Sequence, residues 1–109
     1  MELHEKILET VKATGIPVTD WLISENGEIY KPPYACVSDV DGHGIYADGK
    51  LVIPIEMVKV QLVYTPDDDI TVSKIKTALE PYGYEWQKEK FGAERVMIMT
   101  LTVEGGTIN

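Results

Sequence analysis

One alternating segment, residues 55–65, constrains the fold of this chain more than any other part of its sequence. Large apolar side chains stand at every second position there, and Lys59 and Gln61 stand between them. A period of two is typical of a β-strand with one buried and one exposed face. We therefore expect a central strand whose buried face carries Val58, Val60, Leu62 and Tyr64.

Two amphipathic segments predict helices that can cover such a strand. The first, residues 2–14, ends before Gly15, and the second, residues 70–80, ends before Pro81, as glycine and proline commonly end helices. Each is about three turns long and is marginal by itself, so both must pack on other elements. Their apolar residues recur at helical spacing: Leu3, Ile7, Leu8 and Val11 in the first, Val72, Ile75 and Leu79 in the second.

Further apolar segments between turn-forming residues predict additional strands. They cover residues 18–24, 34–40, 51–53, 84–90 and 94–104. The expected order is α-β-β-(β)-β-α-β-β, and most links are as short as hairpin loops. This pattern predicts an α+β fold, with a mixed or mostly antiparallel sheet of about four to six strands and both helices on one face. We expect one domain over residues 1–104 and a flexible tail over residues 105–109.

The charge of the chain disfavours nucleic-acid binding. Its 109 residues carry a net charge of −8, and Arg95 is the only arginine. Proteins that bind nucleic acid usually gather Lys and Arg on one face, whereas here the lysines are scattered. The single cysteine, Cys36, excludes an intrachain disulfide, and no apolar run is long enough for a membrane span. We expect a cytoplasmic protein whose first residues begin a helix rather than a signal peptide.

Two acidic segments invite a metal-site interpretation that their details contradict. Residues 39–44 resemble the start of a calcium loop, but Lys50 stands where the closing bidentate glutamate is required. Residues 67–69 are three consecutive aspartates at the expected start of a helix, where carboxylates cap free N–H groups. We predict a turn in the first case and a helix cap in the second.

No catalytic constellation emerges from the nucleophilic and titratable residues. His4 and His43 are the only histidines, and neither stands at metal-ligand spacing from the other or from Cys36. Cys36 lies in an alternating apolar run, which favours a small buried side chain over a reactive thiol. We predict no catalytic residue, no metal and no cofactor.

The apolar residues instead predict a protein interface. The segment 96–103 is apolar on both faces, and residues 55–65 carry further apolar side chains on the otherwise polar face. Because two helices cover one sheet face, we expect the other to stay partly apolar and to bind another chain. The alternative is that the loops at 25–33 and 41–50 cover that face. The predicted interface residues are Met57, Val63, Met97, Met99, Leu101 and Val103.

The ordered set of motifs resembles small tail-terminator or tail-completion (neck) proteins of long-tailed, siphovirus-type phages and prophages. The similarity spans most of residues 5–104. The matching segments follow an N-terminal helix: Thr14 to Val18, Lys31 to Tyr34, Ala47 to Gly49, Val58 to Thr65, and a hairpin with Glu94 and Arg95.

This resemblance implies a non-enzymatic structural protein that terminates or joins the tail tube at the head–tail junction. It further implies a homo-oligomeric ring, often a hexamer, with the tail tube and head connector as partners. Such a protein resides in the host cytoplasm during assembly and then in the virion. A small cytoplasmic adaptor is the alternative, and an enzyme whose pocket combines Cys36, Asp39 and His43 is a third hypothesis.

Overall fold

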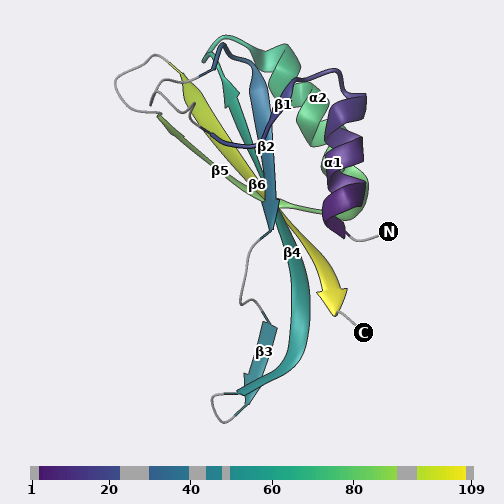
Figure 1. Ribbon diagram of the computed structural model, residues 1–109. Helices are drawn as coiled ribbons and strands as arrows, with labels where there is room; N and C mark the ends of the chain where they lie inside the picture. Colours follow the sequence, from purple (N-terminus) through teal and green to yellow (C-terminus); the bar gives the residue numbers. More distant parts are fainter. Residues whose placement is uncertain (1–2, 23–29, 40–43, 48–49, 91–95, 108–109) are drawn as a thin grey trace.

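The computed structural model describes residues 3–22, 30–39, 44–47, 50–90 and 96–107, and for 44–47, 50–56 and 105–107 it describes the backbone alone. The elements confirm the α+β class (Figure 1), and their order roughly follows the prediction, except that the strand before β4 lies at residues 44–47 and not at 51–53. They are α1 (Leu3–Ala13), β1 (Val18–Thr19), β2 (Tyr34–Asp39), β3 (Gly44–Ala47), β4 (Lys50–Tyr64), α2 (Asp69–Leu79), the 3-10 turn η1 (Glu80–Tyr82), β5 (Glu85–Lys90) and β6 (Met97–Thr107).

The described strands form one mixed sheet in the order β1-β2-β4-β6-β5, with β3 also paired to β4. β1 runs parallel to β2, and all the other pairs are antiparallel. The central strand is β4, which pairs with β2 on one side and with β6 on the other. The alternating segment recognised in the sequence therefore lies in the middle of the sheet.

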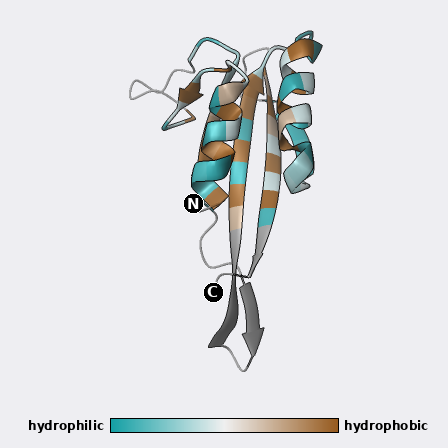
Figure 2. Cartoon of the chain, turned by 90° about the vertical axis from the view of Figure 1, so that its right-hand side faces the viewer, coloured by the Kyte–Doolittle hydropathy of each residue, from teal (hydrophilic) through white to brown (hydrophobic). Residues whose placement is uncertain are grey.

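Both helices cover the same face of this sheet. In Figure 2 they lie in front of the strands, and α1 contacts α2, β2 and β4. The helices are short and amphipathic, so burying their apolar stripes against the sheet is what stabilises them. The resulting core confirms the predicted faces of β4 and of both helices; its buried members include Ile7, Val11, Val58, Val60, Leu62, Ile75, Leu79, Met99, Leu101 and Val103.

The helix ends follow the chemistry of the sequence. Gly15, just beyond α1, has a φ of +84°, a conformation that glycine adopts without the steric cost of a Cβ. At the start of α2, the backbone N–H of Thr71 donates a hydrogen bond of 3.1 Å to Oδ1 of Asp68. The hydroxyl of Thr71 donates a second, of 2.7 Å, to Oδ2. The capping role predicted for the aspartates is confirmed at Asp68.

Three strand boundaries differ from the sequence prediction. Of the predicted strand 18–24, the described part is a strand at Val18–Thr19 alone. The predicted strands 51–53 and 55–65 are one continuous strand, β4, which runs through Pro54. β6 continues through Thr107, so the predicted tail boundary after Glu104 is wrong. The reason is long-range pairing, because Thr107 lies opposite Ile55 and extends the ladder past the boundary.

The second face of the sheet is covered at one end by the chain itself. A small cluster there contains Tyr34, Val63, Val96 and Ile98, all buried, with Leu22 and Tyr30 packed against them. The hydroxyl of Tyr34 donates a 2.7 Å hydrogen bond to the carbonyl of Leu22. The premise that this face stays apolar without another chain is therefore wrong at this end, because Tyr30, in the predicted loop at 25–33, and Leu22, shortly before it, cover the face.

A two-stranded arm extends from the body of the molecule. It consists of residues 44–47 in β3 and 50–54 in β4, which pair antiparallel with a shift in register between Ile45 and Tyr46. Figure 1 shows this arm below both helices and beyond the rest of the sheet. The arm contributes to the elongated shape of the molecule, whose extents are 45 × 28 × 22 Å.

Candidate functional site

The titratable and nucleophilic side chains do not come together at one site in the part of the chain that the structure describes. Nδ1 of His4 lies 3.0 Å from Oδ1 of Asp39, which links α1 to the end of β2. The thiol of Cys36 is buried and donates a hydrogen bond of 3.6 Å to the carbonyl of Asp20. Burial raises the pKa of this thiol, so it stays protonated and weakly nucleophilic near neutral pH. Its interpretation as a small buried side chain is confirmed.

The two metal-site interpretations have different outcomes. Asp68 caps α2, as predicted, and its hydrogen bonds with Thr71 lower the pKa of its carboxyl group. Residues 40–43 of the other acidic segment, His43 included, lie outside the described residues. The loop predicted at 41–50 is wrong where it is described, because residues 44–47 form β3 and Lys50 begins β4. Among the residues that are described, no group of three or more His, Cys, Asp or Glu side chains could hold a metal ion.

The six predicted interface residues divide between two faces and two degrees of burial. Met99, Leu101 and Val103 are fully buried beneath the helices, so the isolated chain does not offer them to a partner. Val63 is fully buried in the cluster on the opposite face. Met57 and Met97 are half-buried. The prediction misassigned the first three because alternation identifies the members of a face but not which face the helices cover.

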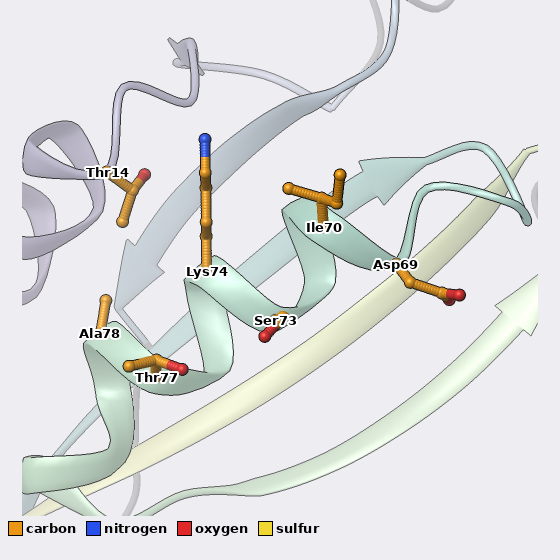
Figure 3. Close-up of a pocket in the computed structure, with 7 residues that line it drawn as sticks. All are labelled: Thr14, Asp69, Ile70, Ser73, Lys74, Thr77 and Ala78. Carbon is orange, nitrogen blue, oxygen red and sulfur yellow. The ribbon is translucent and has the colours of Figure 1, made fainter.

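A shallow groove of about 610 Å³ runs along α2. Figure 3 shows Ile70 and Lys74 extending from α2 on the side of Thr14, while Asp69 points away from them. Ile70 is 73% exposed, and the hydroxyls of Ser73 and Thr77 add polar groups. This lining pairs no nucleophile with a histidine or carboxylate base at hydrogen-bond distance, so the groove does not define a reaction.

Among the described strands, β5 forms an open edge of the sheet, and this edge is the first notable surface. All six of its side chains are exposed, and β6 is its partner on one side. Trp86 lies opposite Leu101 and so projects toward the helix-covered face, where it is 49% exposed. Nζ of Lys76 lies 4.1 Å from the centre of its ring, and Nζ of Lys88 lies 5.5 Å from it. The Trp86 indole thus makes cation–π contacts with one lysine of α2 and one of β5.

The two faces of β5 carry opposite charges. Lys88 and Lys90 lie opposite Met99 and Met97, so they share the helix side with Trp86. Glu85 and Glu89 lie on the other side, opposite Thr102 and Ile98. The alternation of acidic and basic residues along 85–90 is visible in the sequence. It matters for binding only because β5 lies at an edge of the sheet.

The opposite edge of the sheet, at β1, forms the second surface. β1 pairs with β2 on one side, and both of its residues are half-buried. Directly after it come Asp20, which is exposed, and Trp21, which is 71% exposed. Each edge of the sheet thus presents backbone groups, a charged side chain and a large exposed indole.

Comparisons with known proteins leave the family of this chain open. No family model, no curated protein and no solved structure matches it. None of the described helices is both long enough and apolar enough to cross a membrane. The functional interpretation consequently depends on the sequence resemblance and on the surfaces described above.

Proposed function

We propose that this chain is a non-enzymatic assembly subunit that binds other copies of itself and neighbouring chains at a phage head–tail junction. The tail-terminator or tail-completion role comes from the sequence resemblance. The observation that supports assembly is the arm formed by residues 44–47 and 50–54, which extends beyond the cover of the helices.

The physical argument concerns what such an arm can bury. A two-stranded hairpin by itself is at best marginally stable in water, because it has no third strand or helix to pack against. Five of the nine residues in this arm are large and apolar: Ile45, Tyr46, Leu51, Val52 and Ile53. Both helices lie over the other part of the sheet, so a second chain is the natural source of a packing surface.

The arm also offers free strand edges. β6 accompanies β4 as far as the pair of Ile55 with Thr107, and no described strand lies beside residues 50–54 on that side. Within the described chain, no strand pairs with the outer edge of β3 either. Unpaired strand edges are templates for strand addition by another chain.

Light scattering after gel filtration, at several protein concentrations, tests the proposal. We expect a mass that rises to a defined multimer and ring-shaped particles by negative-stain electron microscopy. A variant with Tyr46→Ser, Leu51→Ser and Ile53→Ser should lose multimer while its body keeps the cooperative unfolding of the parent. The matched control is Ile70→Ser, which removes an exposed apolar side chain from the body and should leave the multimer unchanged.

Two outcomes would count against assembly through the arm. A protein that is monomeric at every concentration and yields no ring contradicts the proposal. A strict one-to-one complex with an unrelated cytoplasmic protein, again without rings, supports the adaptor hypothesis instead.

A further inference from the structure

We propose that copies of this chain join head to tail through their sheets, with β5 of one copy pairing antiparallel to β1 of the next. This inference rests on the proposed function, because it names the contact that would hold the assembly together. Three features of the described residues lead to it: two open edges at opposite ends of the sheet, the directions of the strands, and the distribution of charge.

The backbone of β1 is available for another strand. The N–H of Ala35 donates a 2.8 Å hydrogen bond to the carbonyl of Pro17, so the carbonyl of Pro17 points toward β2. Backbone groups of successive residues in a strand alternate in direction. The N–H and carbonyl of Val18 therefore point away from β2, to the open edge.

The strand directions make the two edges compatible. β2 and β6 are both antiparallel to β4 and so run the same way, while β5 runs opposite to β6. β1 runs parallel to β2. When two copies stand side by side with their helices on the same face, β5 of one is consequently antiparallel to β1 of the other. The ladder then continues from one sheet into the next with regular hydrogen-bond geometry.

The charges on β5 oppose the simplest alternative, a twofold pairing of β5 with itself. In such an antiparallel pair, directly opposed residues lie on the same face. Centring the twofold axis at Lys88 places this lysine beside its own copy. Shifting the axis by one residue in either direction places glutamates beside glutamates, Glu85 opposite Glu89 or Glu89 opposite itself. Like charges directly opposed destabilise a strand pair.

The β1 edge provides a better partner for β5. Asp20, directly after β1, is an exposed carboxylate, and its charge is opposite to that of the exposed Lys88 and Lys90 on β5. The contact would also cover Trp21 and Trp86, two of the large apolar side chains that the described chain leaves exposed. Exposed aromatic residues of this kind are enriched at the centre of protein interfaces. Because each copy has one edge of each type, the contact can repeat and close into a ring.

Cross-linking between introduced cysteines tests this contact. Thr19 lies opposite Cys36, on the face away from the helices, and Gln87 lies on that same face of β5. The variant Thr19→Cys with Gln87→Cys, treated with a short bismaleimide, should give a ladder of dimers, trimers and larger species on a denaturing gel. The unmodified chain is the background control, since its Cys36 is buried. Each single variant should remain at the monomer position.

A charge exchange provides an independent readout. Lys88→Glu with Lys90→Glu should lower the multimer fraction measured by light scattering at least several-fold, and adding Asp20→Lys should restore it. Lys12→Glu, on the exposed side of α1, makes a charge change of the same kind away from both edges and should have no such effect.

The outcomes separate this contact from the proposed function. Multimers that form without a cross-linked ladder, or a dimer from Gln87→Cys alone, overturn the pairing of β5 with β1 but leave assembly intact. Monomers at every concentration, with no ladder, overturn both. A ladder together with rescue by the charge exchange establishes the head-to-tail contact.

Discussion

Replacing Leu101 with alanine distinguishes a core role from the interface role that the sequence suggested for this residue. Leu101 is fully buried, with Val60 of β4 opposite it on one side and Trp86 of β5 on the other. It belongs to the cluster that includes Ile75 and Leu79 of α2. The substitution removes buried methyl and methylene groups at a place where neighbours on three elements limit relaxation.

The magnitude follows from this full burial. Truncating a buried leucine to alanine costs about 2–5 kcal/mol, through lost transfer free energy and the cavity left behind. A small domain has a total free energy of unfolding of about 5–15 kcal/mol, so the variant should fold but lose a large part of its stability. With a urea slope of about 2 kcal/mol per molar, the midpoint should fall by roughly 1–2.5 M.

Met57→Ala provides the matched control. Met57 is only partly buried, so its truncation should cost less than that of the fully buried Leu101. Equilibrium urea unfolding followed by Trp fluorescence, repeated at several protein concentrations, separates folding stability from assembly. If Leu101→Ala unfolds at the parent midpoint but loses multimer, Leu101 is an interface residue and the core assignment is refuted.

Two further predictions concern hydrogen bonds made by side chains. Because the pKa of Asp68 is lowered from its ordinary value of 3.8, its cap should stabilise the fold above that pH, and the benefit should vanish as pH falls through the folded-state pKa. In urea unfolding, the difference in free energy of unfolding between the parent and Asp68→Asn should therefore shrink as the pH falls from 6 to about 2. A difference that does not change with pH would contradict this cause. Tyr34→Phe removes the donor to the carbonyl of Leu22 and should cost about 1–3 kcal/mol, since that carbonyl loses its partner. An unchanged midpoint would show that water replaces the hydroxyl.

Local patterns predicted the parts of the fold that depend on near neighbours in sequence. The alternation at Val58, Val60 and Leu62 identified one face of β4, and the acidic segment before α2 identified the cap at Asp68. These signals are strong because periodicity and capping depend on residues a few positions apart. The rough order of elements followed from the same signals, although β3 lies in a segment that the sequence predicted to be a loop.

The candidate surfaces were harder to predict because they depend on the position of each strand in the sheet. Trp86 has the alternation of an inward residue, yet it is 49% exposed because β5 is an edge strand, although Lys76 lies over its ring. Trp21 is exposed because β1 ends at Thr19. Both facts depend on which strands lie beside β5 and β1, and no local pattern contains that information.

By itself, the sequence determined two amphipathic helices, the alternation of the central strands and an α+β class, because each depends on contacts within a few residues. Tertiary structure alone decided that Met99 and Leu101 lie beneath the helices, that Tyr30 covers the opposite cluster, and that β5 and β1 form the open edges. The physical reason is that strand pairing joins residues far apart in the chain, such as Ile55 with Thr107. Which edges remain open is therefore settled only when the whole sheet has formed.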